Sequence, residues 1–261
     1  MRLVDASGVA YEPVRPPRRI VSLIPSTTET LCDLGLADAL VGVTAYCVEP
    51  RDVVRRKTRV GGEKNPDLAK IRALAPDLVV ANIEENAREH IEALRAWGIA
   101  VWVTYPKTVA EGLAMIRELG RLTGTEARAA ALLAELEPLL ARVRAETATR
   151  PRARVFYPVW RAPWMTIGPD TYIHDLLRVC GADNVFGDRA ERYPTVTLDE
   201  VAARRPDVVV LPDEPFRFRR IHVRDFEGLG ARVHLVDGKR FAWHGPRVAT
   251  ALATVPALFA R

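Results

Sequence analysis

A set of polar and aromatic residues falls where predicted β-strands give way to loops. Tyrosine and tryptophan offer flat apolar surface with one polar group, and Glu, Arg and His add charge and hydrogen bonds. In a parallel α/β sheet, the loops at the carboxyl ends of the strands usually hold the ligand. The predicted ligand-binding residues are Tyr46, Glu63, Glu84, Trp160, Arg161, Trp164, Glu214, Arg217, Trp243 and His244.

The tryptophans favour one kind of ligand. Three of the five, Trp160, Trp164 and Trp243, lie in predicted loops in the second half of the chain. A tryptophan on a loop is exposed unless a ligand or a neighbouring lobe covers it, which favours a planar or macrocyclic ligand such as a corrinoid. The alternative is that Trp160 and Trp164 pack on each other beneath their own loop.

The charged residues leave the ligand class open. Arg161 and Arg217 suit an anionic ferric siderophore, because guanidinium groups pair well with fixed anionic oxygens. The nearby acids would neutralise these arginines and suit a neutral or cationic ligand instead. His244 could donate an axial ligand to a chelated metal, or it could bind backbone groups in its tight turn. The other histidines form no H-x-x-H or H-x-H pattern, so we expect no site for a bare metal ion and no cofactor of the protein's own.

One segment of the chain occurs twice. LAKIRALAPDLVV at 68–80 returns as LDEVAARRPDVVV at 198–210, an offset of 130 residues. Each copy reads as a helix, a Pro-Asp turn and a buried strand. The repeat predicts two similar lobes with parallel sheets and a ligand cleft between them.

The elements around the repeat follow the same order in both halves. Ser26 is predicted to cap the first helix in a capping box with Glu29. Residues 108–149 carry no strand signal and read as two helices broken at Thr123-Gly124, the second of which would be a rigid bar. The other predicted elements are strands at 20–24, 41–44, 101–104, 155–159, 185–186 and 233–236 and helices at 26–35 and 171–180.

Nearly the whole chain resembles the helical-backbone class of ABC-transporter substrate-binding proteins, which includes vitamin B12 and ferric-siderophore receptors. The resemblance implies a class III periplasmic binding protein, with two Rossmann-like lobes joined by one long rigid α-helix. It implies an N-terminal lobe at 1–107, a helical linker at 108–150 and a C-terminal lobe at 151–261. The motifs that carry it are RIVSLIPSTTETLCDLGLADALVGV at 19–43, LAKIRALAPDLVVA at 68–81, DLLRVCGADNVF at 175–186 and LDEVAARRPDVVVL at 198–211.

The resemblance also implies a function. Such a protein captures a metal chelate, here a corrinoid such as cobalamin, as a monomer and delivers it to an ABC permease dimer. A ferric siderophore or haem is the alternative ligand. In this class, an acid near the start of each Pro-Asp helix docks on the permease. Asp199 fills that place in the second lobe, but the first lobe has Ala69 there, so Asp67 or Glu63 would substitute. Asp67 and Asp199 could instead simply stabilise the N-termini of their helices.

Composition and missing motifs exclude other classes. The net charge of +5 comes from scattered arginines rather than a basic stripe, so nucleic-acid binding is not expected. No export signal and no apolar run long enough to span a membrane occur. The resemblance implies a periplasmic or other extracytoplasmic location, while the missing signal leaves a cytoplasmic one open. A hydrolase using paired acids, Glu84-Glu85 with Asp213-Glu214, is the alternative from another class, but Ser26 lacks a G-x-S-x-G context and a placed histidine.

Overall fold

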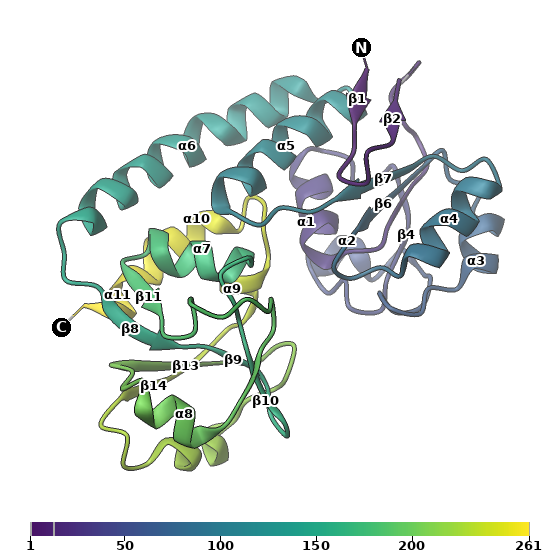
Figure 1. The fold of residues 1–261 in the computed structure, drawn as a ribbon. Coiled ribbons are helices and arrows are strands. Elements are labelled where there is room, and N and C mark those ends of the chain that lie inside the picture. The colour runs from purple at the N-terminus through teal and green to yellow at the C-terminus, as the bar shows by residue number, and fades with distance from the viewer. Residues whose placement is uncertain (1, 13, 261) are drawn as a thin grey trace. The chain divides into compact units, whose positions relative to one another are not determined.

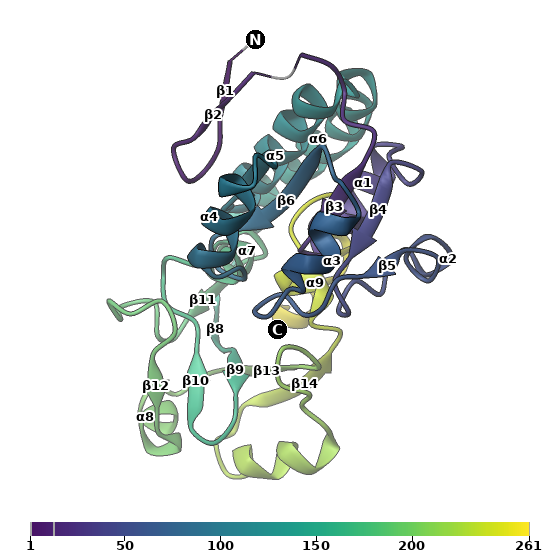
Figure 2. The same cartoon turned by 90° about the vertical axis from the view of Figure 1, so that its right-hand side faces the viewer.

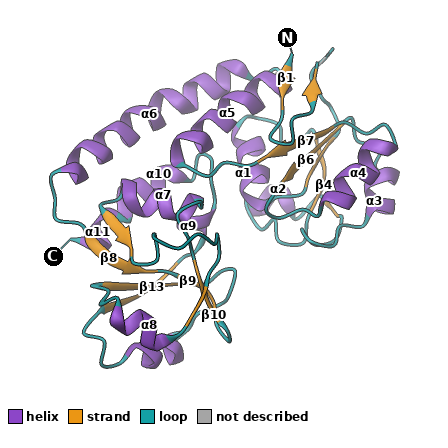
Figure 3. Cartoon of the chain, viewed as in Figure 1, coloured by secondary structure: helices purple, strands orange, loops and turns teal. Residues whose placement is uncertain are grey.

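The computed structural model describes residues 2–12 and 14–260. The chain forms two compact units, each with its own strands and helices (Figure 1, Figure 3). Unit 1 holds the residues up to Pro106 together with Gly112–Ala134, and unit 2 holds Lys107–Glu111 and the residues from Glu135 onward. The predicted α/β class with two parallel-sheet lobes is therefore confirmed.

Unit 1 is built on a five-stranded parallel sheet with strand order β5-β4-β3-β6-β7. Strands β5, β4, β3 and β6 follow one another across the sheet in Figure 2. The sheet's two central strands and β7 are buried throughout. This burial is typical of parallel strands covered on both faces, and it explains their runs of Val, Ile and Leu. The strands are β3 (Ile20–Ser22), β4 (Leu40–Val43), β5 (Thr58–Arg59), β6 (Leu78–Asn82) and β7 (Val101–Thr104).

The helices of unit 1 cover this sheet. On one face, Ile71 and Leu94 from α3 and α4 pack against Val21, Val79 and Val103 of the strands, and α3 and α4 lie beside the sheet in Figure 1. The last two helices, α5 and α6, are each shared between the two units. The helices are α1 (Pro25–Asp33), α2 (Arg51–Val54), α3 (Leu68–Ala73), α4 (Arg88–Ala96), α5 (Val109–Thr123) and α6 (Glu126–Ala148).

Unit 2 contains two sheets. The larger is parallel with strand order β11-β8-β13-β14, and the smaller is antiparallel with order β12-β10-β9. The strands are β8 (Ala153–Phe156), β9 (Pro158–Trp160), β10 (Trp164–Thr166), β11 (Ala182–Asn184), β12 (Thr195–Val196), β13 (Val208–Pro212) and β14 (Arg232–Val236).

The core of unit 2 joins the larger sheet to its helices. Phe156, Val209 and Leu211 of the strands pack with Phe186 and Phe226. Phe226 ends a 3₁₀ helix, η1, which precedes the edge strand β14. The helices are α7 (Tyr172–Val179), α8 (Leu198–Ala203), η1 (Arg220–Phe226), α9 (Lys239–Ala242), α10 (Val248–Thr254) and α11 (Pro256–Phe259).

The predicted Pro-Asp repeat is present and makes equivalent hydrogen bonds in both units. The carboxylate of Asp77 accepts bonds from the backbone N–H groups of Arg18 and Arg19, each at 2.9 Å. The carboxylate of Asp207 accepts one from Arg154 at 2.8 Å. The guanidinium group of Arg19 donates at 2.6 Å to the carbonyl of Leu74, the C-cap of α3. That of Arg154 donates at 2.6 Å to the carbonyl of Arg204, the C-cap of α8 (Leu198–Ala203). Asp, rather than another residue, follows the proline because its carboxylate fixes the start of the neighbouring strand.

Three local predictions were wrong. Helix α1 begins at Pro25 with Ile24 at the N-cap, and no side chain caps it. Proline is favoured at the first helical position, so Ser26 lies within the first turn and its predicted capping role with Glu29 is not present. The predicted strand at 155–159 is two strands, because Pro158 lacks an N–H group and starts a strand of the other sheet. The strand predicted at 185–186 lies earlier, at β11.

The predicted helical stretch after unit 1's sheet is confirmed as two helices. Gly124 has a positive φ of 70° and separates α5 from α6. The hydroxyl groups of Thr123 and Thr125 lie 2.9 Å apart across the break. Glycine adopts this backbone conformation without the cost that a Cβ atom imposes, which is why the break falls at this position.

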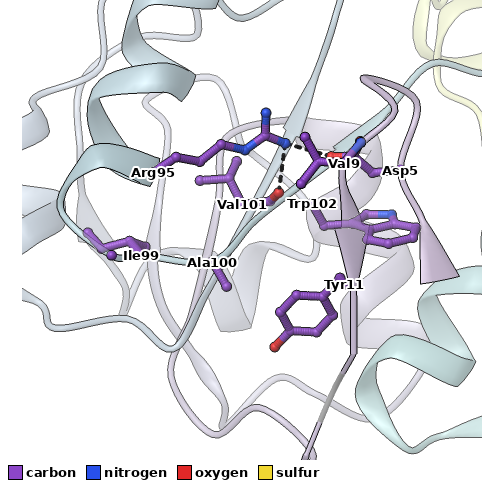
Figure 4. Close-up of a pocket in the computed structure, with 9 residues that line it drawn as sticks. Asp5, Val9, Tyr11, Arg95, Ile99, Ala100, Val101 and Trp102 are labelled. Carbon is purple, nitrogen blue, oxygen red and sulfur yellow. Dashed lines mark hydrogen bonds and ion pairs between the residues drawn. The ribbon is translucent and has the colours of Figure 1, made fainter. Parts of the chain in front are cut away.

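The sequence patterns did not predict a short N-terminal hairpin that protects the edge of unit 1's sheet (Figure 4). Ala6 donates its N–H group to the carbonyl of Val103 at 2.9 Å, and the N–H group of Val103 donates to the carboxylate of Asp5 at 3.1 Å. Asp5 also pairs with Arg95 at 2.7 Å. A pocket of about 330 Å³ lies here, at the amino end of β7. The hairpin strands are β1 (Leu3–Val4) and β2 (Ala10–Tyr11).

Candidate ligand-binding site

Each parallel sheet has a point where the strand order reverses. In unit 1, β3 comes first in the chain and lies between β4 and β6; in unit 2, β8 comes first and lies between β11 and β13. Loops that leave the carboxyl ends of such strands diverge, and the crevice they leave is the usual ligand site of an α/β sheet. The predicted ligand-binding residues lie on or near these loops in both units.

Two buried asparagines organise the loops of unit 1. The Asn86 side chain accepts a hydrogen bond from the backbone N–H group of Asn82 at 2.9 Å and donates to the carbonyl of Glu63 at 3.0 Å. The amide of Asn82 in turn bonds Thr104 at 3.3 Å and the N–H group of Glu84 at 2.8 Å. These bonds tie the loops after β5, β6 and β7 together. The backbone positions of Glu63 and Glu84 are therefore fixed before any ligand arrives.

The acids of unit 1 lie beside a lysine. Lys64 donates to the carbonyl of Glu84 and forms an ion pair with Glu85 at 3.3 Å. Glu63 and Glu84 are both partly exposed. The pair between Lys64 and Glu85 is well exposed to water, so its contribution to stability is small. Its consequence is electrostatic, since this lysine offsets part of the negative charge of these loops.

The same loops present apolar surface. Tyr46 is 62% exposed, Val48 43% and Ile83 42%, and all three follow the carboxyl ends of β4 or β6. Large apolar side chains that gather on one edge of a domain mark a surface that a ligand or a partner covers. Tyr46, predicted as a ligand-binding residue, is thus accessible. Its neighbour Cys47 is not, because its thiol is buried between the hydroxyl groups of Thr28 and Thr44, each 3.2 Å away.

The aromatic residues of unit 2 form one connected group. Trp160 is 44% exposed and meets Phe216 edge to face at 5.5 Å. Trp164 is more buried and stacks on Phe218 at 5.9 Å. Phe216 and Phe218 are themselves 4.8 Å apart. Trp160 and Trp164 therefore each pack on a phenylalanine, and a large part of the Trp160 ring remains open to solvent.

The two predicted arginines of unit 2 differ. Arg161 binds both carboxylate oxygens of Asp225, at 2.9 and 3.3 Å, and lies 5.6 Å from the ring of Trp164. This hydrogen bonding raises the pKa of the Arg161 guanidinium, and two of its N–H donors are already bound to a carboxylate of the protein. Arg217 is exposed in the loop after β13. Of the two, Arg217 is the better placed to meet an anionic ligand.

Trp243 and His244 are not on the surface, contrary to the prediction of an exposed Trp243. Trp243 is 6% exposed because Lys239 and Arg247 lie over its ring, at 5.9 and 5.0 Å. His244 is 9% exposed and packs edge to face on Tyr172 at 5.8 Å. Burial lowers the pKa of His244 to about 4, so its imidazole is neutral at physiological pH.

Glu214 follows β13 and is mostly buried, which raises its pKa to about 7. The Trp243 side chain donates a hydrogen bond to it, and this bond acts in the opposite direction on the pKa. Trp243 is therefore a partner of the predicted ligand-binding acid. Its aromatic face is covered by cations of its own unit.

The two predicted permease-docking acids also differ. Asp67 is the N-cap of α3, where its carboxylate accepts the N–H group of Lys70 at 3.0 Å, and this bond lowers its pKa. Asp199 lies exposed in the first turn of α8. Thr197 and Glu200 form a capping box at the start of α8, and Asp199 takes no part in it.

The described residues, 2–12 and 14–260, lack two features that other functions would need. Within them, no cluster of His, Cys, Asp and Glu has a geometry that could hold a metal ion. None of their helices combines the length and apolar character needed to cross a membrane.

The sequence matches the model of the periplasmic binding protein family over residues 20–217. This chain therefore belongs to the periplasmic binding protein family, whose members are substrate-binding transport proteins rather than enzymes. A vitamin B12-binding protein of Photorhabdus laumondii is 26% identical over 94% of this chain and 89% of its own length. One from Vibrio parahaemolyticus is 27% identical over 77% of this chain and 72% of its own length.

Solved structures share the fold over nearly the whole chain. The periplasmic vitamin B12 binding protein of Vibrio cholerae has a TM-score of 0.82 at 24% identity and covers 93% of this chain and 96% of its own. The periplasmic haem-binding protein of Roseiflexus has a TM-score of 0.78 at 22% identity and covers 93% of this chain and 97% of its own. Among these solved structures, the same fold thus binds different ligands, vitamin B12 in one and haem in the other.

Four residues of the candidate site are not among the predicted ones: Asn82, Asn86, Phe216 and Phe218. Asn82 and Asn86 organise the loops of unit 1 but stand in a polar stretch beside the more conspicuous acids. Phe216 and Phe218 continue the aromatic surface of Trp160. Their alternation after β13, with Arg217 between them, is a signal that could have found them, because alternate residues of an extended segment point to the same side.

Proposed function

We propose that this protein is the substrate-binding component of an ABC importer and that it captures a corrinoid, cobalamin in particular. One observation carries the proposal: relatives named vitamin B12-binding proteins match up to 94% of the chain. The exposed aromatic and apolar side chains at the carboxyl ends of the strands support it. Tyr46 and Ile83 in unit 1 and Trp160 in unit 2 offer the flat apolar contacts that a macrocycle needs.

The remaining predicted ligand-binding residues would then have defined roles. Glu63, Glu84 and Glu214 would hydrogen-bond polar groups at the rim of the macrocycle, and Trp164 would support Trp160 through the aromatic group. Arg161 would act indirectly, by fixing the loop between β9 and β10 through Asp225. We do not assign axial metal ligation to His244, because its ring is packed against Tyr172.

A ferric siderophore or haem is the second candidate ligand. The observation that favours it is the exposed arginine set that follows β13, Arg217, Arg219 and Arg220. These cations would attract an anionic chelate. The acids of the same loops, Glu214 among them, oppose that attraction.

The importer would engage this protein through acids on its surface. In unit 2 we propose Asp199, which is exposed and has no capping duty. In unit 1 we propose Asp67, whose second carboxylate oxygen lies 3.3 Å from the Lys70 ammonium in an exposed ion pair that an arginine of the permease would replace. Such a partner implies a location outside the cytoplasmic membrane and a single copy of the chain for each permease dimer.

A thermal-shift panel separates the candidate ligands. Each of cyanocobalamin, cobinamide, haemin and ferrichrome would be added to the purified chain at a concentration far above a micromolar Kd. A ligand at about 100 times its Kd stabilises the folded state by about 2.7 kcal/mol. We expect the two corrinoids to raise the melting temperature. A shift with haemin or ferrichrome alone would transfer the assignment to the second candidate, and no shift with any of them would refute the proposal.

A further inference from the structure

Glu214 occupies a special place in the larger sheet of unit 2. It lies two residues after β13, which pairs with β8 at the point where the strand order reverses. Its side chain is mostly but not wholly buried. A ligand that binds at this switch point would reach it.

The surrounding residues hold the carboxyl group in place. A Cβ atom at Gly238 would lie 2.6 Å from Cγ of Glu214 and 3.0 Å from its backbone oxygen, so only glycine leaves room for this packing. The Trp243 side chain donates a hydrogen bond to the carboxylate. Gly238 donates its own N–H group to the neighbouring acid, Asp213, at 2.8 Å. Glu214 is therefore a fixed group and not a mobile surface acid.

Two acids and one lysine act on Glu214, and the lysine has the largest of these three electrostatic effects; one of the acids, Asp237, also lies 3.8 Å from Arg240. Asp213 and Asp237 both act on it electrostatically, and Lys239 is the cation that opposes them. Burial raises the pKa of the Tyr157 phenol, and Glu214, Asp213 and Asp237 raise it further. The Tyr157 hydroxyl has no hydrogen-bond partner among the described residues. Burial with these like charges raises the pKa of Glu214 to about 7. Near neutral pH its carboxyl group therefore exists in both protonated and ionised forms.

We propose that Glu214 is the contact in unit 2 that determines ligand specificity, an inference that rests on the proposed function. Glu214 accepts an uncharged amide of the ligand and rejects a carboxylate in the same position. An amide suits this group in both of its forms. Its N–H donates to the carboxylate, and its carbonyl accepts from the protonated acid. A ligand carboxylate would instead approach Glu214, Asp213 and Asp237 together, and like charges held in a partly buried site repel strongly.

Corrinoids allow this to be tested one group at a time. Cyanocobalamin carries several primary amides, and its monocarboxylic acids each replace one amide by a carboxylate of nearly the same shape. The measurement is the Kd of cyanocobalamin and of each separated monocarboxylic acid, by isothermal titration at pH 8, for the wild type and for Glu214→Gln. The ratio of the two Kd values reports discrimination and cancels any general loss of affinity.

We expect the wild type to bind at least one monocarboxylic acid more than about 10-fold more weakly than cyanocobalamin, and Glu214→Gln to reduce that ratio to about threefold or less. In the wild type, the ratio should also shrink as the pH falls from 8 to 6, because Glu214 takes up a proton over that range. The variant should not show this trend. Glu227→Gln, an exposed acid after η1, is the matched control and should keep the wild-type ratio.

Two negative results have different meanings. If the wild type binds cyanocobalamin but Glu214→Gln keeps the same ratio for every acid, the proposal for Glu214 is wrong and the corrinoid assignment stands. If the wild type binds neither cyanocobalamin nor its acids, the corrinoid assignment itself fails, and the inference fails with it.

Discussion

Trp160 offers the most direct test of the aromatic contact with the ligand. The ring is 44% exposed, which for a side chain that buries about 150–250 Å² leaves roughly 100 Å² open. Covering that area with an apolar macrocycle at about 25 cal/mol per Å² is worth about 2.5 kcal/mol. If the ligand covers one half to all of this area, Trp160→Ala should weaken the binding of cyanocobalamin by about 8- to 70-fold.

The chain offers a matched control for this variant. Trp97 is 41% exposed, almost as much as Trp160, but it is the C-cap of α4 and lies at the amino end of β7. Trp97→Ala should leave the Kd of cyanocobalamin unchanged. Isothermal titration of both variants, after a check of their circular dichroism, gives the comparison. Equal affinities for Trp160→Ala and the wild type, or equal losses in the two variants, would refute the reasoning.

Three further predictions concern stability. Gly238→Ala should lower the free energy of unfolding in urea by about 1–3 kcal/mol, because the added Cβ atom crowds Glu214, although the φ of −61° at Gly238 suits alanine. In a Glu214→Ala background the loss should be smaller, and full additivity of the two substitutions would contradict this prediction. Asp5→Ala should lower the free energy of unfolding by about 2–3 kcal/mol, because it removes the ion pair of Arg95 beside β7. Arg88→Ala breaks an exposed ion pair and should change the stability little. Equal melting temperatures of these two variants would argue against the hairpin's role. The pKa of His244 is lowered from 6.5 to about 4, so on acidification the unfolded chain takes up the proton before the folded chain does. About 3 kcal/mol of stability is therefore lost as the pH falls between those two values. The loss should be smaller in His244→Gln, and an unchanged pH profile of the stability would count against the burial of His244.

The sequence predicted the fold well where a pattern is local and repeated. The Pro-Asp unit returned in both halves because an aspartate, an arginine and a helix end make the same bonds in each. The break at Thr123-Gly124 was found because glycine is suited to the positive φ there. The strands predicted at 101–104 and 233–236 are β7 and β14. All of β7 is buried, as is typical of a parallel strand covered on both faces, whereas β14 lies at the edge of its sheet and is at most partly buried.

The predictions failed where a contact between distant residues decides the structure. The N-terminal hairpin depends on Asp5, which binds the backbone of Val103 98 residues later. An exposed Trp243 is predicted from its place in a loop, but Lys239 and Arg247 cover its ring. Arg161, a predicted ligand contact, binds Asp225, which lies 64 residues away and which no local pattern indicates as its partner. Spacing along the chain identifies which residues reach a loop, and packing decides which of them remain open.

Our proposed function requires this member of the periplasmic binding protein family to bind a corrinoid. Isothermal titration of the purified wild-type chain with cyanocobalamin, with haemin and ferrichrome in parallel, measures this binding. We expect one molecule of cyanocobalamin to bind to each chain with a Kd of about 1 µM or tighter, equivalent to about −8 kcal/mol, and the other two ligands to bind at least about tenfold more weakly. Saturable binding of haemin or ferrichrome, with no heat from cyanocobalamin, would contradict the proposed function.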